Sequence, residues 1–325
     1  MMNRNQFLKT TALTAAGSFL LPSRLLGQLP ETGLSGKIQR IGVQLFSIPK
    51  MLDDRPEAAL KMLADMGYEE LELYGPYPFS DRRNKERWAS LEPMLGFTAS
   101  GFFGYELAAF KSLLNSFGFR VPSMHTDLDT LENNLPALAA AARDLGATYV
   151  TLPSIPEDRR QTLDDYKRMA DGFNVIGKAA REEGIRFAYH NHGYGLQESD
   201  GQVPFEVLMD ATDPEGVFLE MDLFWTVSGR ANPSEYLRRY QGRYKMMHIK
   251  DMKELKYFAG DGGDPSQWVG LFPNMTTLGD GALDLKPILD TALETGVEHF
   301  FVEQDMVADP QSALSASYAY LRSLE

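Results

Sequence analysis

Polar side chains that can hold a metal ion follow four predicted strands in the second half of the chain. The four segments are Tyr189-His190-Asn191-His192, Glu220-Met221-Asp222, His248-Ile249-Lys250-Asp251 and Glu303-Gln304-Asp305. Because side chains alternate along a strand, residues two apart point to the same side, so each segment can present a pair of such groups. Buried carboxylates without a partner cost free energy or take up a proton. A cluster of them therefore predicts a divalent cation or a water-filled cleft.

Four of the five histidines lie at predicted strand ends. They are His125, His190, His192 and His248, whereas His299 begins the last predicted strand and belongs to the opposite end of the fold. One such histidine alone is usually an ordinary hydrogen-bonded residue, but four of five in this position favour a site. The chain has no cysteine. Any metal must therefore be held by His, Asp and Glu, and thiolate or iron–sulfur chemistry is excluded.

The composition predicts a folded globular protein that does not bind nucleic acid. Of the 325 residues, 43% are hydrophobic and 24% are charged, as in typical globular domains. Lys and Arg number 32 against 45 Asp and Glu, which gives a net charge of -13. That charge has the wrong sign for a surface that neutralises phosphates.

Residues 1–36 differ from the rest and are predicted to be a signal peptide and linker. Arg4 and Lys9 precede an apolar stretch over residues 10–21, and residues 22–36 are loop-like. The apolar stretch is shorter than the roughly 20 residues that span a bilayer, so we expect no stable membrane anchor. The start resembles twin-arginine export signals, but Arg4 is followed by Asn5, so the arginine pair is missing. These features predict an exported, periplasmic protein; the alternative is an amphipathic N-terminal helix that stays on the chain.

The remaining residues, 37–325, are predicted to form one α/β domain, a (βα)₈ TIM barrel. Short β-branched or aromatic runs alternate with longer segments of helical period, and eight of each occur. The expected strands span residues 41–48, 69–75, 121–127, 148–154, 185–192, 216–222, 245–251 and 299–305. The expected helices span residues 56–66, 105–117, 130–145, 162–183, 204–211, 233–240, 285–294 and 310–323. Eight such units suit a closed barrel, which typically has about 250 residues.

Two features of the connections support a barrel with a site at one end. An open nucleotide-binding sheet is disfavoured because no G-x-G-x-x-G motif follows the first expected strand. The connections over residues 76–104 and 252–284 are longer than the others. Because the loops that follow the strands of a barrel build its active-site face, we expect these two to act as lids.

The motifs FAYHNH, FLEMDLFW, MHIKDM and FVEQD, in this order, resemble those of the sugar phosphate isomerase/epimerase family of xylose isomerase-like barrels. In that family one residue from each of the fifth to eighth strands holds a divalent ion, typically Glu, Asp, His and Glu. The resemblance implies that the ligands here are His190, Asp222, His248 and Glu303. His190 departs from the pattern, because ketose epimerases carry there a glutamate that is both ligand and base. Strands of the YHNH type are more similar to those of inosose dehydratase-type and keto-sugar lyase-type members.

A site with two imidazoles and two carboxylates suits one Mn²⁺ or Zn²⁺ ion best, with Co²⁺, Fe²⁺ or Mg²⁺ as alternatives. Such an ion would stabilise the enediolate that forms when a base removes the proton next to a sugar carbonyl. We expect Glu303 to be a proton acceptor as well as a ligand, and His192 or His125 to be a second acid/base. Lys250 is expected to stabilise an oxyanion or hold a hydroxyl, unless it is an ordinary charged residue at a strand end.

Three further residues are candidate contacts for a sugar. Glu72 in the second expected strand points inward if Tyr74 does, and it would bind either a substrate hydroxyl or a neighbouring basic residue. Phe224 and Trp225 come soon after Asp222, and they either stack on a sugar face or pack at the rim.

The sequence thus predicts a metal-dependent sugar isomerase or epimerase that acts on a small-molecule sugar. A keto-sugar lyase or dehydratase is the first alternative, because β-elimination shares the proton-abstraction step. A non-catalytic exported sugar-binding barrel is the second. A related barrel, the endonuclease for abasic DNA, needs more histidines and a basic groove, which the net charge opposes. The identity of the sugar and the oligomeric state stay open.

Overall fold

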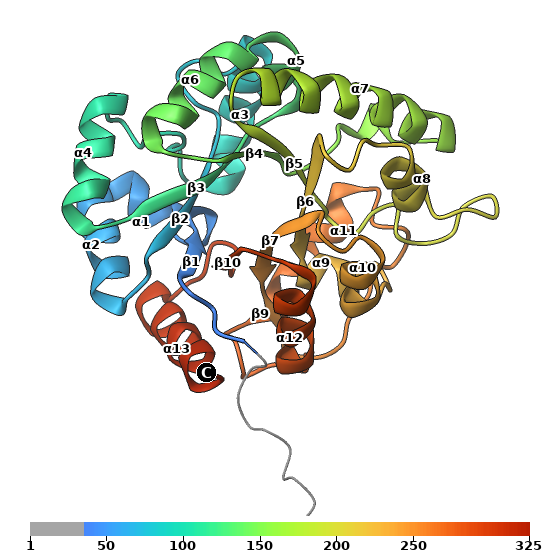
Figure 1. The fold of residues 1–325 in the computed structure, drawn as a ribbon. Helices are drawn as coiled ribbons and strands as arrows, with labels where there is room; N and C mark the ends of the chain where they lie inside the picture. The colour runs from blue at the N-terminus through green and yellow to red at the C-terminus, as the bar shows by residue number, and fades with distance from the viewer. Residues whose placement is uncertain (1–35) are drawn as a thin grey trace, which may run out of the picture. The chain divides into compact units, whose positions relative to one another are not determined.

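The structure is a computed structural model that describes residues 36–325, so the leader predicted for residues 1–36 lies outside the described residues except for Gly36. Within them, eight parallel strands close into a barrel in the order β1-β10-β7-β6-β5-β4-β3-β2 (Figure 1). All eight overlap the expected strands, which confirms the predicted barrel. They are β1 (Ile41–Gln44), β2 (Glu70–Tyr74), β3 (Arg120–His125), β4 (Tyr149–Leu152), β5 (Arg186–His190), β6 (Val217–Asp222), β7 (Tyr244–Ile249) and β10 (His299–Val302).

Helices surround the barrel, and eight of them follow strands as expected (Figure 1). These eight are α2 (Pro56–Met66), α4 (Leu107–Phe117), α6 (Leu135–Leu145), α7 (Leu163–Glu182), α8 (Pro204–Asp210), α10 (Pro233–Arg239), α12 (Leu285–Thr295) and α13 (Pro310–Ser323). Additional helices are α1 (Pro49–Asp54), α3 (Arg82–Leu95), α5 (Leu128–Asn133), α9 (Leu223–Ser228) and α11 (Pro265–Val269). Over residues 36–325, no helix combines the length and apolar character needed to cross a membrane.

The single helix expected over residues 130–145 is wrong, because two helices occupy this segment. α5 begins earlier, where the Asp127 side chain accepts a hydrogen bond of 2.8 Å from the backbone N–H of Thr130. Asn134, between α5 and α6, has a φ of -141°, which is not helical. Pro136 has no backbone N–H, so the hydrogen-bond ladder of a helix cannot run through this point.

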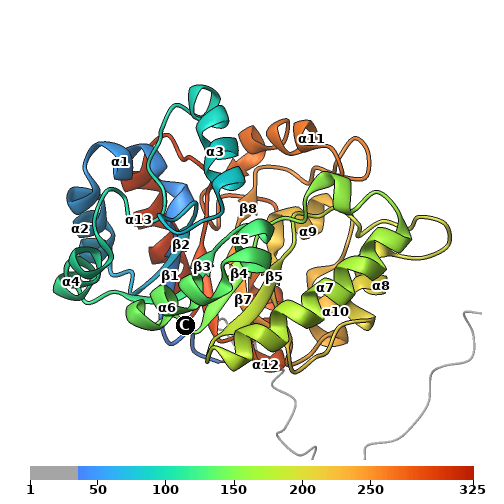
Figure 2. The same cartoon turned by 90° about the horizontal axis from the view of Figure 1, so that it is seen from above.

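The two long connections each contain a helix that the sequence did not predict. Asp81 caps α3 by accepting a hydrogen bond of 2.9 Å from the backbone N–H of Arg83, and Gly96 ends α3 in the left-handed conformation. The connection over residues 252–284 carries α11 and is closed by a short antiparallel pair, β8 (Asp251–Met252) with β9 (Met275–Thr276). The Asp251 carboxylate holds this connection by accepting backbone hydrogen bonds of 2.8 to 3.2 Å. α3 and α11 lie at the same end of the barrel (Figure 2).

The polar site residues stand on an apolar layer of the barrel. A separate buried cluster is formed by Tyr149, Ala188, Met246 and Phe301. Met246 lies two positions before His248 in β7, so both side chains face the same way. The same spacing relates Phe301 to Glu303 at the end of β10. The strand period therefore places an apolar floor under the residues expected to do chemistry.

The space around α7 differs between its two glycines, Gly172 and Gly177. A Cβ atom added at Gly177 would lie 2.4 Å from the carbonyl oxygen of Gly216, whereas one added at Gly172 meets nothing within 4 Å. We expect Gly177→Ala to lower the free energy of unfolding by about 1–3 kcal/mol through overpacking. Gly172→Ala, the matched control in the same helix, should raise it by about 0.5–1 kcal/mol. Denaturant titration measures both, and equal shifts in the two variants would contradict this packing.

Candidate active site

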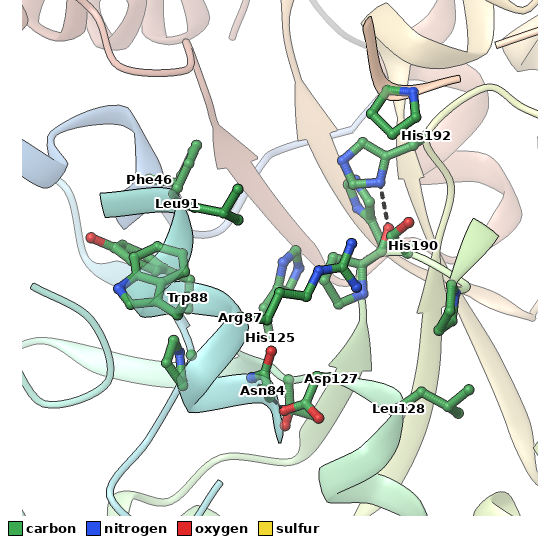
Figure 3. Close-up of a pocket in the computed structure, with 18 of the residues that line it drawn as sticks. Phe46, Asn84, Arg87, Trp88, Leu91, His125, Asp127, Leu128, His190 and His192 are labelled. Carbon is green, nitrogen blue, oxygen red and sulfur yellow. Dashed lines mark hydrogen bonds between the residues drawn. The ribbon is translucent and has the colours of Figure 1, made fainter. Parts of the chain in front are cut away.

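A cavity of about 490 Å³ opens at the ends of the barrel strands. Its lining includes His125 at the end of β3, His190 at the end of β5 and His248 in β7. Because β5, β6, β7 and β10 are neighbours in the barrel, the four polar segments of these strands meet at one place. Figure 3 shows Arg87 and Trp88 of α3 beside the same cavity as His125 and His190. The lid expected over residues 76–104 therefore borders the site.

Three of the four predicted metal ligands come together as one group. Each of Asp222, His248 and Glu303 offers a donor atom, and these atoms lie within 4.8 Å of one another. His248 Nδ1 is 2.7 Å from Glu303 Oε2 and 3.9 Å from Asp222 Oδ2. The fourth predicted ligand, His190, has its Nε2 atom 3.7 Å from Asp222 Oδ2. His190 also belongs to a second group, with His125, Glu220 and His248.

Two buried carboxylates, Glu220 and Glu72, lie against the histidines of the second group. Glu220 Oε2 is 2.7 Å from His125 Nε2 and 3.0 Å from His190 Nδ1. Glu72 Oε2 is 3.1 Å from His125 Nε2 and also contacts His248 Nε2. Both glutamates are fully buried. Sequence analysis placed Glu220 on the same face as Asp222 but did not include it among the four predicted ligands.

Glu72 was expected to bind either a substrate hydroxyl or a neighbouring basic residue. Within residues 36–325, the cavity is lined by His125 and His248 but not by Glu72, which lies against them and accepts a hydrogen bond of 2.8 Å from Gln44 Nε2. The alternative reading, a bond to a neighbouring basic group, describes it better. Glu72 orients the two imidazoles from beneath.

Charges in the second group balance one another. Burial alone would lower the pKa of His125, but the charges of Glu72 and Glu220 outweigh it and raise the pKa to about 9. Burial and Glu72 would raise the pKa of Glu220, but the charges of His248 and His125 lower it to about 2. The pKa of His248 is also raised, because Glu220, Glu303 and Glu72 outweigh its burial. Two protonated imidazoles thus neutralise two carboxylates in the metal-free protein.

His192 is held as a neutral imidazole in one tautomer. Its Nδ1 atom donates to the backbone carbonyl of Pro153, which leaves Nε2 with the lone pair. Burial and the charge of Lys250 lower its pKa to about 3, so it carries no proton on Nε2 at neutral pH. The ring stacks on Trp268 of α11, with 5.1 Å between ring centres. His192 lines the cavity, where its Nε2 can accept a proton.

Lys250 is buried among three carboxylates. Its Nζ atom lies 2.7 Å from Glu303 Oε2, 2.7 Å from Asp305 Oδ2 and 3.1 Å from Asp222 Oδ2. These charges outweigh burial and raise the pKa of Lys250. Burial and the charge of Glu303 raise the pKa of Asp305 to about 6. In the described residues Glu303 and Asp305 line the cavity and Lys250 does not, so Lys250 orients carboxylates rather than holding a substrate hydroxyl itself.

Trp225 and Phe224 differ in whether they reach the cavity. Asp222 Oδ1 accepts a hydrogen bond of 2.9 Å from the backbone N–H of Trp225 and so begins α9 at this point. Both side chains belong to one buried apolar cluster, and of the two only Trp225 also lines the cavity. That cluster also contains Met252, Phe258, Leu271 and Met275. Of the two roles expected for Phe224, packing describes its surroundings, because within residues 36–325 it is fully buried and does not line the cavity.

Sequence analysis missed the residues that α3, α11 and the loop after β4 contribute to the lining. They include Arg83, Asn84, Arg87, Trp88, Leu91, Arg160 and Trp268. The two lids were predicted, but no motif singled out side chains within them. The four-residue spacing of Arg83, Arg87 and Leu91, one helical turn apart, was the available signal. All three tryptophans of the chain, Trp88, Trp225 and Trp268, line this one cavity.

Buried oxygen atoms without hydrogen bonds indicate that the donor set fits a cation. Within residues 36–325 these atoms include Glu72 Oε1 and Glu220 Oε1; Asp222 Oδ2 also makes no hydrogen bond, although the Lys250 ammonium lies 3.1 Å from it. A buried acceptor that makes no hydrogen bond costs free energy, and a metal ion supplies the missing partner. Imidazole nitrogens with carboxylate oxygens are donors that Zn²⁺ and Mn²⁺ accept. The residues present therefore fit a divalent ion.

Sequence comparison places the chain beside carbohydrate-processing barrels. A family-wide profile described as xylose isomerase-like TIM barrel matches residues 60–324. The inosose dehydratase of Lacticaseibacillus casei is 32% identical over 160 residues, which are 49% of this chain and 52% of that protein. The match thus spans about half the length of such curated relatives.

Comparison of structures supports the same fold. A sugar phosphate isomerase/epimerase from Parabacteroides distasonis matches with a TM-score of 0.67 and 23% identity, over 91% of this chain and 98% of that one. The IOLI protein, solved with a zinc atom bound, matches with a TM-score of 0.61 and 14% identity, over 88% of this chain and 98% of that one. The resemblance inferred from the strand-end motifs is confirmed. The chain belongs to the xylose isomerase-like TIM barrel family.

Proposed function

We propose that this protein is a metal-dependent enzyme that removes the proton next to a carbonyl of a keto-sugar or keto-polyol. One observation carries the proposal: Asp222, His248 and Glu303 bring their donor atoms within 4.8 Å of one another beside a cavity. Such a cluster of perturbed titratable groups in a cleft is typical of an active site. The family membership supports an enzyme of the isomerase, epimerase or dehydratase type.

Asp222, His248 and Glu303, with His190 as the fourth ligand, would hold one divalent ion. Zn²⁺ or Mn²⁺ suits these nitrogen and oxygen donors best, and zinc in the IOLI neighbour supports this choice. When bound, the ion would act as a Lewis acid that polarises the substrate carbonyl and makes the neighbouring proton more acidic. The protein contributes the geometry, because Trp225 N–H fixes Asp222 and Lys250 fixes Glu303.

Three side chains of the lining divide the proton transfers. Glu303 is ionised, because the charges of Lys250 and His248 outweigh burial and hold its pKa below the usual value. Its carboxylate can accept the substrate proton. His192 offers a neutral Nε2 as a second acceptor. His125 carries a proton at neutral pH and can donate it.

A protonated His125 in the lining gives elimination a proton donor for the departing hydroxyl. The match to inosose dehydratases, which extends over 160 residues, favours the same outcome. Isomerisation or epimerisation, favoured by the Parabacteroides neighbour, uses the same first step and returns the proton to another carbon or face. Dehydration is therefore the second candidate function, distinguished by loss of water.

The test is to incubate the Mn²⁺- or Zn²⁺-loaded protein with inosose and with keto-hexoses in deuterated water. We expect metal-dependent incorporation of deuterium next to the carbonyl, and NMR measures it. Exchange with retention of all hydroxyls identifies an isomerase or epimerase, and an unsaturated product identifies a dehydratase. Sugar binding without exchange under any metal would contradict the proposal and indicate a non-catalytic sugar-binding barrel.

We further propose that the protein is exported to the periplasm.

Metal affinity should rise with pH. The raised pKa values of His125, about 9, and of His248 mean that both imidazoles are protonated near neutral pH in the metal-free protein. A metal that takes a His248 nitrogen must displace its proton, so the apparent affinity should rise about tenfold per pH unit for each proton released. The increase should level off once the pH exceeds the pKa of the displaced group. Competition with a chelating dye over this range measures the slope, and a flat profile would contradict the assignment of His248 as a ligand.

A further inference from the structure

Two arginines of the cavity lining, Arg87 and Arg160, form no ion pair with a carboxylate of residues 36–325. Other cations beside the cavity are paired. Arg83 Nη2 lies 2.6 Å from Asp129 Oδ1, and Lys250 contacts three carboxylates. A cation seldom stays buried in a protein without a partner, and this chain has an excess of acidic residues to supply one. Of the two, only Arg160 is buried, so its charge calls for an anion from outside the chain.

Arg160 is buried, with 7% of its surface exposed, and its plane is fixed by stacking. The guanidinium carbon lies 3.8 Å from the centre of the Tyr194 ring and 5.6 Å from that of Trp268. Nε donates a hydrogen bond of 2.9 Å to the carbonyl oxygen of Ile155. Among the described residues, no acceptor bonds to the two Nη atoms. Stacking thus leaves the outer edge of the guanidinium free to donate in its own plane.

Arg243 shows how this chain treats a buried arginine that has only a structural role. It is 8% exposed, nearly the same as Arg160. Its guanidinium donates to the carbonyl oxygens of Val217 and Met209 and to Thr212 Oγ1, so all three nitrogens are used. Arg160 has one such bond at equal burial. The difference indicates that its two Nη groups are kept for a ligand.

Arg87 brings a second guanidinium to the same cavity from α3 (Figure 3). One turn earlier, Arg83 is tied to Asp129, which anchors the helix to the segment that follows β3. Asn84 Nδ2 adds a hydrogen bond of 2.7 Å to Asp127 Oδ2. Asp129 and Asp127 are thus already bonded to Arg83 and Asn84. Arg87 is left with its charge toward the cavity.

We propose that Arg160, assisted by Arg87, binds an oxyanion on the substrate, a carboxylate or a phosphate ester. A guanidinium donates two parallel N–H groups to such an oxyanion, and the fixed plane of Arg160 lowers the entropy lost on binding. The substrate class is then a sugar acid or a sugar phosphate instead of a neutral sugar. The sugar part of this inference rests on the proposed function; the oxyanion part rests on the arginines alone.

The test compares charged sugars with their neutral parents by isothermal titration calorimetry. The probes are glucuronate against glucose, galacturonate against galactose, and glucose 6-phosphate against glucose, each with the Mn²⁺-loaded and the chelator-treated full chain. We expect a charged member to bind about ten- to a hundredfold more tightly than its parent, as charge-assisted hydrogen bonds provide. A preference for the uronates or for the phosphate identifies the oxyanion. Equal affinity for charged and neutral members in every pair overturns the proposal.

Three variants separate the arginine from the metal as the source of the preference. Arg160→Gln should remove most of the preference while leaving the affinity for the neutral parent and the metal content unchanged, and Arg160→Lys should retain part of it. Arg159→Gln is the matched control, because this neighbouring side chain pairs with Glu132 at 3.3 Å and is exposed. If Arg160→Gln folds with the same melting temperature and keeps the full preference, the oxyanion binds elsewhere, for example on the metal, and the proposal falls.

The same samples distinguish failure of this inference from failure of the proposed function. Preference for charged sugars without deuterium exchange would leave the oxyanion subsite standing and remove the proton-abstraction chemistry. Exchange that is equally fast with charged and neutral keto-sugars, and unaffected by Arg160→Gln, would support the proton-abstraction chemistry and contradict the oxyanion subsite. Arg87→Gln, on an exposed helix, provides a second variant whose folding does not depend on the stacked core around Tyr194.

Discussion

Asp222→Ala and His248→Ala should each abolish turnover together with stoichiometric metal. Both side chains belong to the group whose donor atoms lie within 4.8 Å of one another. Loss of the ion removes the Lewis acid, so we expect a decrease in rate of at least about a thousandfold, equivalent to roughly 4 kcal/mol of transition-state stabilisation.

Metal analysis of the purified variants by mass spectrometry, beside the deuterium-exchange assay, provides the measurement. His299→Asn is the control, because His299 pairs with Glu70 at 2.8 Å at the start of β10, away from the cavity. It should keep both metal and activity. Full turnover by a metal-free Asp222→Ala protein would show that the cluster does not act through an ion.

Lys250→Met should be the most destabilising single change in the metal-free protein. The Lys250 ammonium is surrounded by Asp222, Glu303 and Asp305, and removal of one partner of a buried ion pair typically costs about 3–5 kcal/mol. Lys245→Met, in the strand β7 that precedes Lys250, breaks a pair with the exposed Glu298 and should cost at most about 1 kcal/mol. The difference between the two variants isolates the effect of burial.

The destabilisation of Lys250→Met should also depend on pH and on metal. As the pH falls, the uncompensated carboxylates take up protons and the free-energy penalty shrinks, and Asp305 is the first to do so, because its pKa is already raised to about 6. A divalent ion should offset part of the loss, since it restores positive charge to the carboxylates. Thermal denaturation with and without Mn²⁺ measures both effects. A melting temperature that matches Lys245→Met at neutral pH would contradict the role given to Lys250.

Strand positions could be predicted from the sequence because each depends on local information. A β-branched run with polar residues two apart at its end indicates both the strand and its inward face, as in His248 and Lys250 of MHIKD. The alternation of side chains along a strand does not predict how deep a side chain lies along the barrel axis. Whether an inward side chain lies at the floor or at the mouth is set by the tilt and stagger of the strands.

The contacts across the barrel therefore escaped sequence analysis. Glu72 meets His248 across 176 positions of sequence, and His125 meets Glu220 across 95. The sequence indicates neither contact, because these strands face each other only once the barrel closes. β1 closes it by pairing with both β2 and β10. The choice between the two roles of Phe224 could not be predicted for a different reason, since the direction of its side chain depends on a helix cap made by Asp222.

The gathering of Trp88, Trp225 and Trp268 around one cavity has a practical consequence. Tryptophan fluorescence from this chain therefore originates only from side chains that line the cavity. Ligand entry, ion uptake or displacement of α11 from His192 should each change that emission, so the unlabelled protein carries its own optical reporter of site occupancy.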